Sequence, residues 1–219
     1  MSIVRFLLTR GNGKLGEAIH AWSLPAVATC PGRSALCERH CYARHGRFRT
    51  DVVRDRLQAN LAAAEAPDFV ARVVREVRCR GARVVRVHVS GDFHSAAYAR
   101  RWASIARRCP ATRFYAYTRS WRVPSVAPAL ADLAALSNFR VWYSTDAETG
   151  LPAAVPPGVR VAFMQAAAGD EAEGAHLVFR TRPLRAPARR VGLTVVCPTE
   201  NGGPRAADTT CTRCRRCFE

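Results

Sequence analysis

The order of strand-like and helix-like segments constrains the fold of this chain more than any other feature of its sequence. From residue 51 onward, segments with apolar residues at helical spacing are interleaved with short runs rich in β-branched and aromatic residues. Strands that alternate with helices form parallel β/α units. We therefore predict an α/β fold, namely a complete or partial (β/α) barrel of the TIM or aldolase-like type. An open doubly wound sheet is the alternative.

The segments themselves can be assigned from apolar spacing and from the residues that start and stop helices. We expect helices at 51–65 with Thr50 as N-cap, from 69 to Gly81, at 98–108 and at 125–137. We expect strands at 17–25, 82–93, 112–120, 139–146, 159–165, 176–180 and 192–198. A chain of 219 residues fits a single barrel-like domain over residues 1–219. Cysteine-rich loops and a metal-binding tail from about residue 197 to 219 would belong to it.

Functional residues of parallel α/β folds collect beyond the carboxyl ends of the strands. Five of the seven predicted strands end in polar or ligating residues, which are Ser90-Gly91-Asp92, Thr118-Arg119-Ser120, Ser144-Thr145-Asp146, Gln165 and Cys197.

Four polar side chains on these strands are candidate catalytic residues. Asp92 and Asp146 could supply acid–base chemistry, although capping of the following helix would explain either one as well. Arg86 and His88 alternate with valines and should share one face of their strand. A polar face of this kind either lines a wet pocket or forms a satisfied buried pair.

Seven of the nine cysteines lie in or beside two tight groups. The chain has no run of 18 apolar residues and no recognisable secretory leader, so we expect no membrane span and a cytoplasmic location in a reducing cytosol. Disulfides are disfavoured in that reducing compartment, and clustered cysteines there are more often metal ligands. The odd number of cysteines also disfavours a fully paired disulfide set.

The C-terminal group has the spacing of an iron–sulfur motif. Cys211, Cys214 and Cys217 form C-x-x-C-x-x-C, and Cys197 is followed by a proline, as is the remaining cysteine of the bacterial ferredoxin pattern. We predict a 4Fe–4S cluster on these four residues. Structural zinc is the alternative, although all-cysteine zinc sites normally show two separated C-x-x-C pairs.

The N-terminal group, which is Cys30, Cys37 and Cys41, has no fourth cysteine nearby in the sequence. His40 and His45 could complete a zinc site. Three cysteines alone would instead suit a cubane with one iron left open. The group is therefore either a second site or shares in the first.

A cubane with one open iron on these three cysteines resembles the site of the radical SAM enzymes. Those enzymes bind S-adenosylmethionine at an open iron on the loop after the first barrel strand. Their usual C-x3-C-x2-C spacing is not kept here. The sequence "VSGDF" resembles the superfamily's "GGE" element, which implies that Gly91 and Asp92 would contact the cosubstrate.

The strong positive charge suggests a polyanionic partner such as nucleic acid. Thirty-four Lys and Arg residues against 17 Asp and Glu give a net charge of +17. Nearly all of this excess is arginine, since Lys14 is the single lysine, and a GC-rich coding sequence produces the same bias. A basic solvated surface is therefore the alternative explanation.

Taken in order, the motifs "CPGRSALCERHCYA", "RVHVSGDFHSAAYARRW", "FYAYTRSW", "FRVWYSTD" and the terminal "CP…CTRCRRC" resemble the bacteriophage gene product 88 family. The resemblance runs from about Leu8 to Cys217 and implies a phage or prophage origin, but no particular reaction.

The cysteine spacing and the charge leave three hypotheses for the function. The first is an iron–sulfur protein with an electron-transfer or redox role and a redox partner in the host. The second is a radical SAM-like enzyme, and the third is a zinc-containing nucleic-acid-binding protein.

Overall fold

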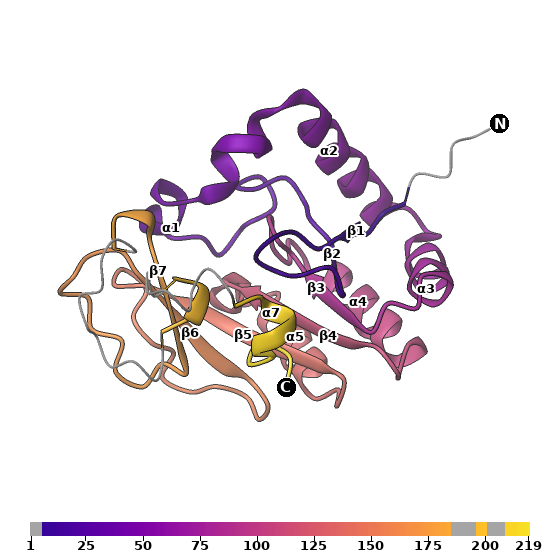
Figure 1. Ribbon diagram of the computed structural model, residues 1–219. Coiled ribbons are helices and arrows are strands. Elements are labelled where there is room, and N and C mark those ends of the chain that lie inside the picture. Colours follow the sequence, from indigo (N-terminus) through magenta and orange to yellow (C-terminus); the bar gives the residue numbers. More distant parts are fainter. Residues whose placement is uncertain (1–5, 185–195, 201–208) are drawn as a thin grey trace.

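The computed structural model describes residues 6–184, 196–200 and 209–219 (Figure 1). At its centre lies a seven-stranded sheet whose strands follow one another in chain order, from β1 to β7. The short β1 (Thr9–Arg10) pairs antiparallel with β2, and every later neighbouring pair is parallel. The parallel strands are β2 (Ile19–Ala21), β3 (Val84–Val87), β4 (Arg113–Thr118), β5 (Phe139–Thr145), β6 (Arg160–Gln165) and β7 (Leu177–Arg180).

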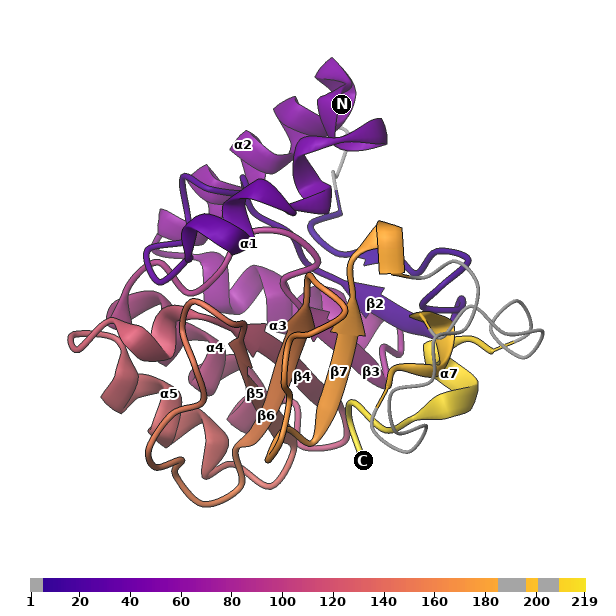
Figure 2. The same ribbon diagram turned by 90° about the vertical axis from the view of Figure 1, so that its left-hand side faces the viewer.

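Three helices, α3 (Phe69–Cys79), α4 (Ala96–Arg108) and α5 (Ala127–Ala134), cover one face of the sheet, and the C-terminal segment lies on the other (Figure 2). We call the face without these three helices the open face. The other helices are α1 (Ala35–Arg39), α2 (Asp51–Glu65) and α7 (Cys211–Cys214). Short 3-10 turns lie at Tyr42–Arg44, Gly46–Arg49, Ser120–Arg122, Arg182–Leu184 and Pro198–Glu200. No helix in the described ranges is long and apolar enough to cross a membrane.

The predicted α/β class and the mainly parallel sheet are confirmed, whereas closure into a complete barrel is not found. Within the described residues, the pairing beyond β7 is a single parallel bridge between Val178 and Val196, and β1 does not meet β7. The alternative of an open doubly wound sheet is confirmed in that the sheet is open, but it is wrong in its winding, because strand order never reverses along the sheet. The connections that follow β5 and β6 contain no helix in the structure, so the outer layer that a full barrel requires is incomplete.

Most predicted segments are present, with shorter strands than expected. The helix at 51–65 has its predicted bounds, and Thr50 occupies the N-cap, although its hydroxyl donates to the carbonyl of Arg47 at 2.9 Å. The strand expected at 17–25 contains only three paired residues. The strand expected at 192–198 lies largely outside the described residues. Strand β1 and helix α7 were not predicted, because neither has enough residues to show a periodic pattern.

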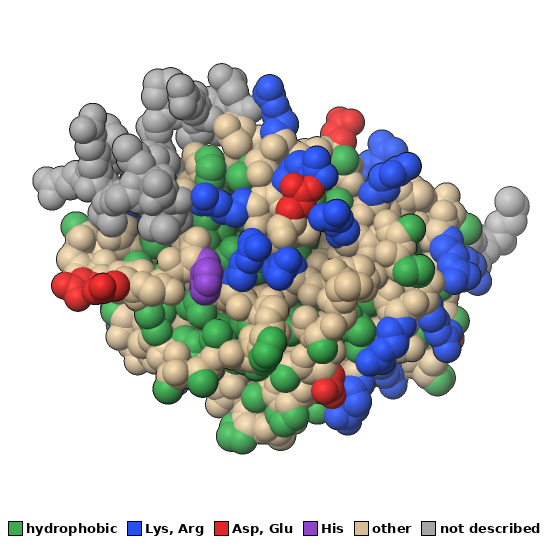
Figure 3. All heavy atoms as spheres, turned by 90° about the horizontal axis from the view of Figure 1, so that it is seen from below, with side chains coloured by type: hydrophobic (Ala, Val, Ile, Leu, Met, Phe, Trp, Pro, Cys, Tyr) green, Lys and Arg blue, Asp and Glu red, His purple; other side chains and the backbone are tan. Residues whose placement is uncertain are grey.

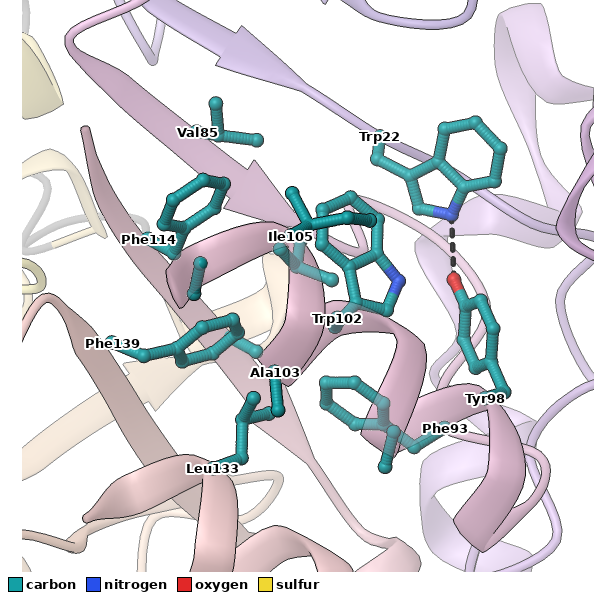
Figure 4. Packing of buried hydrophobic residues seen from close by; sticks show 14 of the residues in the cluster. Trp22, Val85, Phe93, Tyr98, Trp102, Ala103, Ile105, Phe114, Leu133 and Phe139 are labelled. Carbon is teal, nitrogen blue, oxygen red and sulfur yellow. Dashed lines mark hydrogen bonds between the residues drawn. The ribbon is translucent and has the colours of Figure 1, made fainter. Parts of the chain in front are cut away.

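The main core lies between the sheet and helices α3, α4 and α5 (Figure 4). Trp102 of α4 packs edge-on against Trp22, at 6.0 Å between ring centroids, and both side chains are fully buried. The indole N–H of Trp22 donates to the hydroxyl of Tyr98 at 2.7 Å. The strand residues on this side alternate along each strand, which places Val85, Val87, Phe114, Ala116, Phe139 and Val141 in the core.

His88 breaks the alternation that the sequence predicted for its strand. Strand β3 ends at Val87, and His88 has a left-handed backbone, with φ of 70°. The turn carries the imidazole to the helix face, where it contacts Tyr98 at 3.0 Å and packs on the ring of Phe93. Arg86 stays on the open face. The expectation that Arg86 and His88 share one face is therefore wrong, because alternation holds only while the backbone remains extended.

His88 should make the stability of the protein depend on pH. Burial, and then the charges of His94 and Arg86, lower its pKa to about 3 in the folded protein. In the unfolded chain its pKa is about 6.5, so between these values the unfolded state binds more protons. The free energy of unfolding should fall as the pH drops below about 6.5, by at most about 1.4 kcal/mol per pH unit from this group.

The test of this pH dependence is chemical denaturation of wild type and His88→Asn at neutral and mildly acidic pH. Asparagine tolerates a left-handed backbone and does not titrate. Burial also lowers the pKa of His20 and His94, so both proteins should lose stability in acid. We expect the smaller loss in the variant; equal losses would contradict the assignment to His88.

Two candidate metal centres

The N-terminal cysteines lie on the segment that follows β2 and passes over the carboxyl ends of the strands, which point upward in Figure 2. Cys30 precedes α1, Cys37 lies within it, and Cys41 follows it, all half-buried. Burial, and then the neighbouring carboxylate of Asp92, raise the pKa of Cys30 to about 12, and Cys37 and Cys41 add to this effect. The three thiols thus lie on one short segment around α1, and their role as metal ligands stays a prediction.

The loop that carries this group is tied to the ends of β4 and β5. The hydroxyl of Ser34 accepts the N–H of Cys37 at 2.9 Å and donates to Asp146 at 2.5 Å. Gly32 lies so close to strand β4 that a Cβ atom there would be 2.0 Å from the carbonyl oxygen of Arg119. Neither contact was predicted, and the only sequence signal for Ser34 is its position before a short helix.

Beneath the loop, Arg119 joins the two aspartates that the sequence proposed as acid–base residues. Its backbone N–H donates to Asp92 at 2.8 Å, and its guanidinium pairs with Asp146 at 2.7 Å. The second oxygen of Asp92 accepts the N–H of Phe93 at 2.7 Å. All three charged residues are buried. In this arrangement both carboxylates hold the strand ends together.

Gly91 has a packing reason for being glycine. Its φ is +78°, and a Cβ atom would be 2.5 Å from the Cβ of Leu24 and 2.6 Å from the hydroxyl of Thr29. Gly91 therefore lets the turn after β3 approach the segment after β2. This contact explains the glycine without a cosubstrate. His40 is half-buried at the end of α1, and His45 is exposed.

The four C-terminal cysteines line a single small pocket, together with Leu177, Pro198, Thr199, Arg215 and Arg216. Cys197 is buried directly after the bridge to β7, and the other three cysteines lie on or beside α7. The pKa of Cys217 is raised to about 11, mainly by burial; the neighbouring hydroxyl of Tyr117 opposes this rise, and the charges of Cys211 and Cys197 add to it. The pocket thus unites cysteines that are up to 20 positions apart in sequence.

Backbone contacts hold α7 against the N-terminal segment and the open face. The N–H of Cys211 donates to the carbonyl of Lys14 at 2.9 Å, and the hydroxyl of Thr212 donates to Leu15 at 2.8 Å. The indole of Trp142 on β5 donates to the carbonyl of Cys217 at 2.9 Å. The cysteine pocket is therefore attached to both ends of the chain and to the sheet.

All nine cysteines lie in the described residues and are free thiols. In the same part of the chain, no three His, Cys, Asp or Glu residues form a group that could hold a metal ion. Zinc bonds of 2.3 Å in a tetrahedron require sulfur atoms about 3.8 Å apart. The thiols thus surround a pocket without meeting at a single-ion site. Cys79 is exposed at the end of α3, and Cys109 is buried apart from both groups.

The sequence pattern of the family described as "Gene product 88" matches residues 6–219. The chain belongs to the gene product 88 family. Among curated proteins, this family member is similar to the "Gene 88 protein" of Mycobacterium phage L5, with 29% identity over 149 residues that cover 62% of this chain and 60% of the relative. It is 26% identical to the "Gene 88 protein" of Mycobacterium phage D29 over 225 residues, covering 95% of this chain and 86% of that relative.

The chain thus spans less than two thirds of the L5 relative and most of the D29 relative. Both relatives of this gene product 88 family member are bacteriophage proteins, in agreement with the resemblance found in the motifs. No solved structure matches the chain.

Proposed function

We propose that this phage protein binds a 4Fe–4S cluster through Cys197, Cys211, Cys214 and Cys217 and has a redox or electron-transfer role. The observation that carries the proposal is the convergence of these four thiols on one pocket. Two cysteines outside the motifs, Cys79 and Cys109, lie elsewhere. The cysteines that line the pocket are therefore those of the predicted ligand motif, whereas cysteines outside the motifs are not drawn into it.

The donor set fits such a cluster. Four cysteine thiolates are the usual ligands of a 4Fe–4S cubane. A cubane is larger than a single ion, so its four cysteine sulfurs must stand further apart than the sulfurs around one zinc ion. Thiols arranged around a pocket therefore fit a cubane better than a single zinc ion. When bound, the cluster would supply one-electron chemistry. The chain's own contribution is to hold four thiols around the space and to shield them from solvent on the side of the sheet.

Cys30, Cys37 and Cys41 are proposed as a second cluster site with one iron left open. The supporting observation is that the segment around α1, which carries these cysteines, passes over the carboxyl ends of the parallel strands, where enzymes of this architecture keep their chemistry. A radical SAM-like activity at this group is the second candidate function. Against this candidate function, Gly91 already packs against Leu24 and Thr29, and both carboxylate oxygens of Asp92 already accept backbone N–H groups.

The proposed redox partner would carry negative charge near its docking face. Arg113 and Arg215 both pair with Glu219, and the guanidinium of Arg140 donates to the backbone carbonyl of Glu219 at 3.0 Å. Arg215 and Arg216 themselves line the pocket. Lys and Arg side chains are prominent on the side of the molecule shown in Figure 3. Nucleic acid is the alternative polyanion, and zinc the alternative metal.

The test is metal analysis of full-length protein purified without oxygen. We expect a brown protein with broad visible absorption and about four iron and four sulfide ions per cluster. A colourless protein with bound zinc and no sulfide would contradict the proposal. The reduced sample, supplied with S-adenosylmethionine, should release 5′-deoxyadenosine only if the second candidate function is correct.

A further inference from the structure

The open face of the sheet presents an aromatic wall to the C-terminal cysteines. The ring of Tyr117 on β4 stacks on Trp142 at 5.5 Å and meets the edge of Phe179 at 5.1 Å. Tyr115, on the same strand, packs against Phe218 at 5.6 Å. Both tyrosines belong to the cluster of side chains that also contains Cys211 and Cys217. This wall therefore forms one side of the surroundings of the proposed metal site.

Three cations lie over the rings of this wall. Arg86 is 5.6 Å from the centre of the Tyr117 ring, Lys14 is 5.5 Å from Phe179, and Arg160 is 5.5 Å from Trp142. The charge of Lys14 is met by Glu200 at 2.6 Å. Arg86 has no carboxylate partner among the described residues. Its positive charge is thus held beside the cysteine pocket without a counter-ion.

Three hydrogen-bond donors of the wall are buried without a partner in the described structure. They are the Nε of Arg86 and the hydroxyls of Tyr115 and Tyr117, the last of which lies beside the thiol of Cys217 without the geometry of a hydrogen bond to it. Arg86 and Tyr115 are direct neighbours in the β3–β4 register, and Tyr115 is only 1% exposed. A buried donor without an acceptor costs about 1–3 kcal/mol. Two such hydroxyls beside a cation whose own Nε–H also lacks an acceptor indicate that an anion is the missing acceptor.

The cysteine side of the wall is where that anion would be. A cubane on four thiolates carries net negative charge, which increases by one on reduction. Burial opposes the charge of Arg86, but Tyr42, Tyr115, Tyr117 and Cys211 raise its pKa, so the guanidinium remains positive. Donors and positive charge near such a cluster stabilise the reduced form and raise its reduction potential.

We propose that Arg86 and Tyr117, supported by Tyr115, stabilise the negative charge of the cluster held by Cys197, Cys211, Cys214 and Cys217 and set its reduction potential. This inference rests on the proposed function. It assigns to Arg86, which the sequence suggested as a catalytic residue, a role in tuning the cluster. Tyr117 and Tyr115 act as donors from the sheet, where the fold fixes their positions.

The experiment is a redox titration of the anaerobic full-length protein, followed by electron paramagnetic resonance. The signal of the C-terminal cluster is identified by its loss in Cys214→Ala. In Tyr117→Phe and in Arg86→Gln we expect the midpoint potential to fall. A tenfold change in the redox equilibrium constant corresponds to 59 mV for one electron. Arg86→Lys, which keeps the charge, should retain more of the wild-type potential than Arg86→Gln.

Tyr143→Phe is the matched control, because it removes a hydroxyl from the helix face of the neighbouring strand. It should leave the potential unchanged. Wild-type potentials in both Tyr117→Phe and Arg86→Gln would overturn the inference while leaving the cluster in place. A wild-type protein without iron and sulfide would instead overturn the proposed function itself. Tyr117→Phe keeps the ring that packs on Trp142, so this variant tests the hydroxyl of Tyr117 alone.

Discussion

Replacing Cys214 by alanine is expected to abolish the C-terminal cluster while leaving the fold intact. Cys214 is half-buried in α7, and its backbone N–H donates to Thr210 at 2.9 Å, a bond that alanine keeps. The variant removes one of the four thiols around the pocket, so a cluster with four cysteine ligands should no longer assemble there. Iron and sulfide per chain should fall by the content of one cluster.

The control for this experiment is Cys79→Ala, which removes an exposed thiol at the end of α3. Its iron, sulfide and visible spectrum should equal those of wild type. Circular dichroism should be the same for all three proteins. Unchanged metal content in Cys214→Ala would show that this cysteine is not a ligand, and the assignment of the C-terminal group would fail.

Replacing Asp146 by alanine is expected to destabilise the protein by about 3–5 kcal/mol, because it leaves the buried charge of Arg119 uncompensated. The carboxylate is fully buried and pairs with Arg119 at 2.7 Å. It also accepts the hydroxyl of Ser34 at 2.5 Å and the N–H groups of Glu148 and Thr149 at 3.0 Å each. Urea denaturation of the apo-protein measures the loss.

Asp132→Ala on the exposed side of α5 serves as the control and should change the free energy of unfolding by less than about 0.5 kcal/mol. A loss below about 1 kcal/mol in Asp146→Ala would contradict the structural role of this ion pair. Asp146 would then be free to act in acid–base chemistry, as the sequence alone allowed.

Local patterns predicted the regular elements well where many residues repeat one signal. Helix α2 has 15 residues with apolar positions at helical spacing, and its bounds agree with the prediction. Strand β3 shows the opposite case. The alternating pattern in its sequence continues through Ser90, but the strand ends at Val87, where the left-handed backbone of His88 follows. That conformation comes from packing against Phe93 and Tyr98, residues further along the chain.

The sequence by itself determined the α/β class, the parallel strands and the two cysteine groups, because periodicity and ligand spacing are local properties. The tertiary structure alone decided that the sheet stays open, since closure depends on whether distant edges meet. It also decided that Asp92 and Asp146 hold Arg119, and that Arg86 faces Tyr115 and Tyr117 beside the cysteine pocket. Strand register and loop packing set these contacts, and neither follows from spacing along the chain.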